Sequence, residues 1–388
     1  MQVNQVYNIV NSLAGQLFGS TAVAVTDTTG LRALGQSVAS AAGYDKFLSL
    51  LVDRIGKTII RTLDSEIEFP GLLRNDFSMG AMLQKITVSL PDSIENDAWN
   101  ISSPGFTPTN FDVHLPSATV TYFAGTATWK VQQTIPDEPM LNSAFDSAEA
   151  MGAFISGIID AMTKAINEQI NAVSKATIAS LAVEKADNSS ATVVDLLTPY
   201  NTLAGTSLTA GDAIYDKGFL RYAAQQIKRY IAYMDTPSVL YNEGDGNGNA
   251  VLRRTKRDNM HVWLLHDFWD GVNTYAQSDT FHNELTSLPY FKDVKMWQGS
   301  GTTPATFADC STIHAKAQNG DDVEMTYVIG MLADREAIGI GKFQIKTSSQ
   351  RNDIDDYTNM ATKCNIMHYV DTSENAVVFV LAAPTITP

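Results

Sequence analysis

The residue types that most often do chemistry are present, but their spacings match no catalytic or metal-binding motif. The histidines show no H-E-x-x-H spacing, and the chain has no G-x-S-x-G nucleophile turn. Its two cysteines favour reduced core thiols over a disulfide framework or a metal site. The sequence therefore predicts no catalytic, cofactor-binding or metal-binding residue. The histidines are His114, His261, His266, His282, His314 and His368, and the cysteines are Cys310 and Cys364.

Gly56, Lys57 and Thr58 match only the end of a phosphate-binding loop. Such a loop needs a glycine five residues before its last glycine, where this chain has Leu51. It also lies after a strand and before a helix, whereas here a helical period precedes the triplet and a β-like run follows it. Nucleotide binding is therefore not expected at this place.

Two oxygen-rich segments resemble cation-binding loops without completing the pattern. Glu243–Asn249 offers three oxygen ligands, but Ala250 and Lys256 occupy the positions where a calcium loop needs Gly and Glu. The acidic segment 352–356 lies between two expected strands. Both segments are interpreted as solvated loops.

A run of basic residues stands out in an otherwise acidic chain. Arg253, Arg254, Lys256 and Arg257 fall within five positions. Such a run binds an acidic partner or phosphate, or it is simply a solvated or subunit-facing surface. The second interpretation is favoured.

Composition excludes several classes of protein. A net charge of −15 argues against general nucleic-acid binding. Hydrophobic residues make up 44%, enough for a core, but charged residues only 18%, which suggests a surface partly covered by other subunits. No apolar run approaches 18 residues, so no membrane span is expected. Met1–Val10 also lacks the basic and apolar regions of a signal peptide.

One long amphipathic helix, predicted over residues 146–181, organises the chain. Its apolar side chains recur in steps of three and four, and polar residues fill the opposite face. Asp146 is expected to cap the first turn, and Gly152 and Gly157 would be tolerated where something packs close. The apolar positions are Met151, Phe154, Ile155, Ile158, Ile159, Met162, Ile166, Ile170, Val173 and Ile178.

Residues 64–136 have the pattern of an extended, proline-rich β excursion. Strands are predicted over 85–90, 117–123 and 126–134, the last two joined by a short turn at 124–125. A two-stranded hairpin is only marginally stable alone in water. This segment is therefore expected to lie on a neighbour.

The rest of the chain is predicted as helices and strands with an α/β texture in its middle part. Residues 1–43 are expected to form a short helix followed by a weakly structured arm, and residues 184–211 a polar linker. Further helices are predicted over 44–57, 216–234 and 266–286, and further strands over 260–265, 294–297, 326–332, 337–346, 365–370 and 376–381.

The order of these elements resembles the major capsid proteins of tailed bacteriophages, which have the Hong Kong 97-type fold, and is closest to those of small short-tailed phages. Four places carry the resemblance. Two are the lead-in segments Phe47–Arg61 and Thr134–Phe145; the others are the strand–helix–strand pattern Met260–Trp297 and the closing strands Leu332–Leu381.

The resemblance implies an α+β fold in which each part has a role. It implies no enzymatic activity and no cofactor. Some relatives crosslink a hairpin lysine to a neighbour's asparagine, but nothing here marks the asparagine or a catalytic acid beside Lys85 or Lys130. The implied parts are an N-terminal arm and lead-in helix at 1–62, an extended loop at 63–135, a peripheral domain at 136–237, an axial domain at 238–330 and the return strands of the peripheral domain at 331–388.

The implied function is self-assembly into the icosahedral head that encloses a double-stranded DNA genome. Its partners would be other copies in hexamers and pentamers, a scaffolding protein, a portal, decoration proteins and packaged DNA held without sequence specificity. The protein would be part of the virion and would assemble in the cytoplasm of the host bacterium. Two alternatives remain at this stage: an encapsulin-like nanocompartment shell and a cytoplasmic α/β enzyme with an unrecognised site. A cargo enzyme and no packaged genome would indicate the nanocompartment shell. A monomer or dimer in solution would indicate the enzyme.

Overall fold

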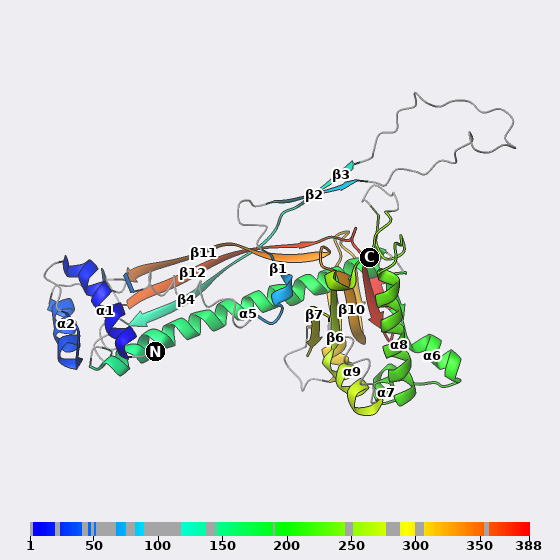
Figure 1. Ribbon diagram of the computed structural model, residues 1–388, viewed down its shortest axis with the longest axis horizontal. Helices are drawn as coiled ribbons and strands as arrows, with labels where there is room; N and C mark the ends of the chain where they lie inside the picture. The colour runs from blue at the N-terminus through cyan, green and yellow to red at the C-terminus, as the bar shows by residue number, and fades with distance from the viewer. Residues whose placement is uncertain are drawn as a thin grey trace, which may run out of the picture. The chain divides into compact units, whose positions relative to one another are not determined.

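The computed structural model contains two compact units, each built from segments that are distant in the sequence (Figure 1). Unit 1 comprises Met1–Gly80, Gly125–Ser174 and Ile340–His368. Unit 2 comprises Ala81–Ala124, Lys175–Gly339 and Tyr369–Pro388. The structure describes residues 3–19, 24–40, 46–47, 50–51, 67–74, 82–88, 118–136, 144, 146–188, 191–244, 251–276, 288–298, 306–352 and 357–388.

The long helix α5 spans Ala148–Asn188 and confirms the predicted amphipathic element. Its predicted apolar positions are mostly buried, whereas Asp160, Lys164 and Glu168 between them are exposed. The predicted cap is wrong: the Ser147 hydroxyl accepts the Ala150 N–H, while Asp146 binds Arg32 at 2.6 Å. The helix also continues past residue 181, because Leu181 and the residues after it are buried.

Two N-terminal helices pack in unit 1, α1 at Val3–Phe18 and α2 at Thr28–Ser40. α1 agrees with the predicted short helix, but α2 lies where only a weakly structured arm was expected. A buried stripe of Leu31, Leu34 and Val38 explains why this Ala- and Ser-rich segment is helical.

The two helix glycines of α5 differ in their surroundings. A Cβ on Gly152 would lie 3.1 Å from a methyl carbon of Val6, so α1 packs close there as expected. No described atom lies within 4 Å of such a Cβ on Gly157, so close packing does not explain that glycine.

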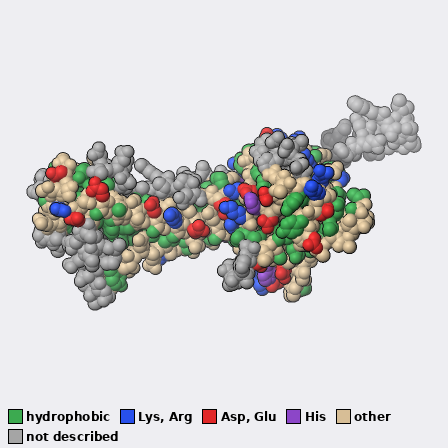
Figure 2. All heavy atoms as spheres, turned by 90° about the horizontal axis from the view of Figure 1, so that it is seen from below, with side chains coloured by type: hydrophobic (Ala, Val, Ile, Leu, Met, Phe, Trp, Pro, Cys, Tyr) green, Lys and Arg blue, Asp and Glu red, His purple; other side chains and the backbone are tan. Residues whose placement is uncertain are grey.

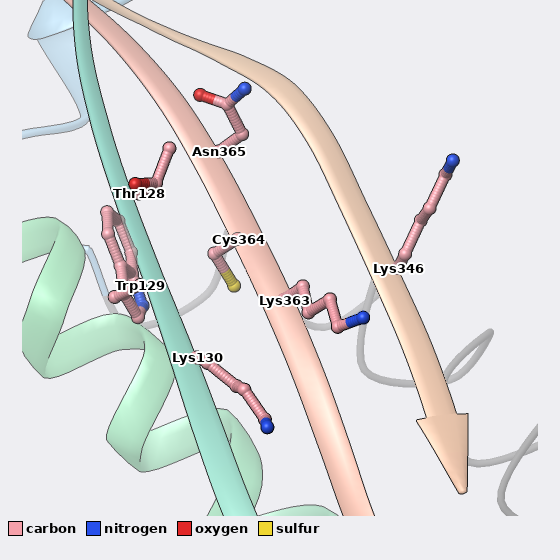
Figure 3. A pocket seen from close by; sticks show the side chains of 7 residues that line it. All are labelled: Thr128, Trp129, Lys130, Lys346, Lys363, Cys364 and Asn365. Atoms are coloured by element: carbon pink, nitrogen blue, oxygen red, sulfur yellow. The ribbon is translucent and has the colours of Figure 1, made fainter.

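The sheet of unit 1 has the strand order β1-β11-β12-β4, and α5 runs along it (Figures 1 and 3). β4 pairs with β12 throughout its length and not with β3, so the predicted turn at 124–125 joins strands of two different sheets. Gly125 is required at this crossing, because a Cβ there would lie 2.4 Å from the carbonyl oxygen of His368. The strands are β1 at Leu73–Arg74, β11 at Ile338–Asn352, β12 at Tyr357–Val370 and β4 at Gly125–Pro136.

Unit 2 is centred on a five-stranded sheet with the order β5-β13-β10-β6-β7. Every residue of the predicted strand at 260–265, now β6, is buried, which is typical of a central strand. Helix α8 at Lys217–Met234 buries its apolar stripe in the same core as β6 and β13. The other strands are β5 at Val193–Asp195, β13 at Ala376–Val380, β10 at Val328–Asp334 and β7 at Tyr290–Val294.

Shorter elements complete unit 2. The segment expected to be a polar linker contains β5 and helix α6, because β5 pairs in parallel with β13 and so joins the sheet. The helices are α6 at Leu197–Ala204, α7 at Ala210–Ala213, α9 at His266–Gly271 and α11 at Phe307–Ser311; the strands are β2 at Leu83–Val88, β3 at Ala118–Phe123, β8 at Ile313–Lys316, β9 at Asp322–Met325 and β14 at Thr385–Thr387.

We expect Ile166→Asp to destabilise the protein by several kcal/mol, because it places a charge without a partner in the core under α5. Lys164→Ala, two residues away on the exposed face, is the matched control and should change stability by less than about 0.5 kcal/mol. Urea unfolding of the full chain measures both. Equal losses would contradict the amphipathic account of α5.

Candidate interaction site at the base of the hairpin

A two-stranded hairpin, formed by β2 and β3, is held at its base by an ionic cluster within unit 2. Lys85 in β2 forms ion pairs with Asp371 and with Glu374, the latter at 2.5 Å, and its ammonium donates to the Ser373 hydroxyl at 3.2 Å. The carboxylates of both acids are almost fully buried. The turn between β12 and β13 therefore holds the base of the hairpin.

Two further cations converge on the same turn. Arg253 donates to Glu374 at 2.7 Å, and the fully buried Lys185 of α5 donates to the carbonyl oxygen of Thr372 at 2.6 Å. Lys185 also lies 3.5 Å from Glu243. The turn thus joins the hairpin to α5 and to the segments around residues 243 and 253.

The turn itself is fixed by internal hydrogen bonds. The Ser373 N–H and hydroxyl both donate to Asp371, at 3.0 and 2.6 Å. Next to it, Asn375 donates to the Thr255 hydroxyl at 3.2 Å, and that hydroxyl donates to Asp334 at 2.6 Å. A buried polar network of this kind favours one geometry when its members are satisfied.

An aromatic contact adds to the anchor. The ring of Phe123, the last residue of β3, lies 5.2 Å from that of Tyr369 in the same unit. Because Phe123 pairs with Leu83 across the hairpin, the same base that carries Lys85 is also packed by apolar surface.

Burial shifts the ionisation of several groups in this cluster. It raises the pKa of Glu374, although Lys85 and Arg253 act in the opposite direction, and it raises the pKa of Glu243 and Asp334. It lowers the pKa of Lys185, which nearby Glu243 opposes. The opposite charges in the cluster therefore offset part of the cost of burying each ionised group.

The opposite face of the hairpin is apolar and exposed. Ile86 and Val120 lie directly across from each other with 61% and 42% of their surfaces accessible, and Tyr122 is 60% accessible. Met82 and Val88 extend the same face. Large apolar side chains gathered on one exposed face mark an interaction surface.

The basic run at 253–257 is divided by the fold. Arg253 is part of the ionic cluster, whereas Arg254 pairs with Asp235 at 3.0 Å. Lys256 and Arg257 are exposed. The run is therefore not one continuous cationic patch.

The other candidates from the sequence have ordinary surroundings or lie outside the described residues. Both cysteines are buried, and burial raises the pKa of the Cys364 thiol to about 11. Among the described residues, no three His, Cys, Asp or Glu side chains are placed to hold a metal ion, and no helix is long and apolar enough to cross a membrane. The segments 56–58, 245–250 and 353–356 lie outside the described residues.

Removing the ammonium of Lys85 should destabilise the base of the hairpin. We expect Lys85→Met to cost about 3 kcal/mol, because it leaves Asp371 and Glu374 without their shared cation. Lys217→Met removes an exposed lysine of the same unit as the control. Urea unfolding of the full chain provides the comparison, and an equal effect of both changes would contradict the anchoring role.

Asp334→Asn should make stability less dependent on pH. Because burial raises the folded-state pKa of Asp334, its stabilising contribution is present below the unfolded pKa and is lost as pH rises through the folded value. Urea unfolding between about pH 4 and 7 should show wild type gaining more from acidification than the variant. The exposed Asp258→Asn controls for net charge. Equal pH slopes for wild type and Asp334→Asn would contradict the shift.

Comparison with known proteins agrees with the Hong Kong 97-type fold expected from the order of elements. The capsid structure of Staphylococcus phage Andhra matches with a TM-score of 0.54 and 11% identity over 80% of this chain and 83% of that one. A chain from the structure of the head fiber and inner core protein gp22 of bacteriophage P68 matches with a TM-score of 0.53 and 10% identity over 81% and 85%. No curated protein matches. The family model for the Phi29-like phage major capsid protein matches residues 8–380, and the chain therefore belongs to this family of shell-forming proteins.

Proposed function

We propose that this capsid protein assembles by laying the exposed face of its hairpin on a second copy of the chain. The supporting observation is the combination of a base fixed by Lys85 and an outward face rich in apolar side chains. Two strands alone are marginally stable in water. Burying Ile86, Val120 and Tyr122 against another copy would remove that apolar surface from water and join the subunits.

Other exposed apolar side chains of unit 2 are suited to further contacts between copies. Figure 2 shows hydrophobic side chains at its surface, interspersed with charged ones. Four of the most exposed in unit 2 are Leu203, Tyr215, Leu240 and Leu252. Different surfaces meeting in head-to-tail fashion generate rings, which is how a single chain type builds pentamers and hexamers.

The division of labour implied by the family applies to this chain as part of the proposal. The parts would be the N-terminal arm at 1–62, the extended loop at 63–135, the peripheral domain at 136–237 and 331–388, and the axial domain at 238–330. The axial domain would meet its copies around the symmetry axes, and the extended loop would overlap a neighbour.

The proposed setting is the icosahedral head of a tailed phage, assembled in the cytoplasm of the host. The chain would act as a structural protein and not as an enzyme. Its partners would include a scaffolding protein, a portal, decoration proteins and packaged DNA. The acidic net charge supports contact with DNA that is weak and independent of sequence, so that the genome slides during packaging.

Charges on the outer face of the hairpin should block assembly and spare the fold. We expect the double change Ile86→Asp and Val120→Asp to leave the melting temperature within a few degrees of wild type, because both side chains are exposed in the single chain. Shell formation, measured by sedimentation and negative-stain microscopy with any required scaffold present, should be lost because charges would be buried between copies.

A matched control separates the hairpin from exposed apolar residues in general. Leu203→Asp introduces the same kind of change on α6, where the side chain is 76% exposed. Its effect on assembly should be smaller than that of the hairpin variant. Normal shells from the hairpin variant would refute the proposed contact, and a wild-type chain that stays monomeric would refute the shell-forming assembly itself.

A further inference from the structure

Three strands of the unit 1 sheet contain basic residues but no acidic ones. β4, β11 and β12 together contain five Lys or Arg residues and no Asp or Glu. The whole chain has the opposite balance, with 27 Lys and Arg against 42 Asp and Glu. These three adjacent strands therefore carry only basic charges in an acidic protein, although the segment 353–356 that joins β11 to β12 in the sequence is acidic. The basic residues are Lys130, Lys342, Lys346, Arg351 and Lys363.

Three of these lysines form an exposed row across the sheet. Lys130 and Lys363 lie directly opposite each other in the antiparallel pairing of β4 with β12, and Lys346 lies on the next strand, β11 (Figure 3). Like charges placed opposite each other in neighbouring strands destabilise a sheet. Within the described residues none of the three has an ion-pair partner, so a counter-charge from elsewhere would stabilise the row.

A pocket of about 530 Å³ lies beside the lysines and shares their residues. The indole N–H of Trp129 lines it and is a buried donor without a hydrogen-bond acceptor among the described residues. Because successive side chains of a strand point to opposite faces, Trp129 lies on the face opposite Lys130. The groups on the exposed face are the three lysine ammonium groups, which are all donors, and such groups recognise carboxylates.

We propose that the row Lys130, Lys346 and Lys363 receives the acidic segment 89–117 of a second copy of the chain. That segment, which connects β2 to β3, contains Asp92, Glu95, Asp97 and Asp112 and no Lys or Arg. The proposal rests on the proposed self-assembly and names the surface that receives the hairpin. Complementary charges would select this surface and orient the two copies.

A phosphate backbone is the other polyanion that lysines attract. The overall charge of −15 disfavours it, because the rest of the chain repels a phosphate backbone. The segment 89–117, in contrast, is present once for every lysine row in a shell of identical chains. The observations therefore favour the second copy.

Charge exchange in the full-length chain tests the proposal. Reversing the row with Lys130→Glu and Lys363→Glu should reduce shell formation at least about tenfold, because it places like charges against each other between copies. Reversing the segment with Asp92→Lys, Glu95→Lys and Asp97→Lys should do the same. Combining both sets should restore shells. Circular dichroism and melting curves establish that each variant is folded.

Two further variants make the result specific. Lys164→Glu with Lys217→Glu alters net charge by the same amount on exposed sites outside the row and should leave assembly near wild type. Lys130→Gln with Lys363→Gln removes the charges without reversing them and should give an intermediate loss, which provides a test if the reversed variant does not fold.

Distinct outcomes would overturn the inference. Wild-type levels of shells from folded lysine variants, or no restoration by the combined set, would refute docking at this row while leaving shell formation intact. Normal shells from the reversed variant that retain less duplex DNA in a salt titration would assign the row to nucleic acid instead. Failure of wild type to assemble would refute the proposed assembly and not this contact alone.

Discussion

The hairpin is constrained by the fact that two strands do not form a stable core by themselves. In this chain, one face of β2 and β3 is fixed by Lys85 to two buried carboxylates, and the other face carries exposed apolar side chains. The ion pairs of the inward face fix the base of the hairpin to the body of unit 2. The apolar side chains of the outward face are exposed to water in the single chain. We propose that a second copy of the chain covers them in a shell built from one protein.

The ionic cluster contributes more to fixing one arrangement of the joined segments than to the net free energy of unfolding. Replacing a buried ion pair by apolar residues is often neutral or stabilising, whereas removing one partner is costly. Lys85, Lys185 and Arg253 reach one short turn from three distant segments of the chain. A turn shared in this way ties the hairpin, α5 and the central sheet of unit 2 to one arrangement, as expected of a subunit whose contacts must repeat around a shell.

Regular patterns were predictable from the sequence, and contacts between distant residues were not. The periodicity of α5 and the apolar run of β6 were both evident. Helix α2 and strand β5 were missed because their formation depends on burial and pairing with distant segments. Strand β4 was predicted to follow β3 as its hairpin partner, but it pairs with β12. The residues of one strand do not specify which other strand it will pair with.

The anchor of the hairpin was the least predictable part of the site. Lys85 and Asp371 are separated by 286 positions, and neither lies in a recognisable motif. The local signal was an acidic turn, Asp371–Asn375, directly before a fully buried strand. The pairing of that turn with a hairpin lysine follows only from the fold.

Oxidative footprinting of the hairpin face, in the unassembled subunit and in the shell, measures the central claim most directly. Met82 and Tyr122 are 61% and 60% exposed in the single chain, and Met331 is fully buried as an internal reference. The account predicts that Met82 and Tyr122 react readily with hydroxyl radicals in the subunit and become strongly protected in the shell, while Met331 stays unreactive in both. Equal reactivity of Met82 and Tyr122 in the two states would show that the hairpin face is not covered by another copy.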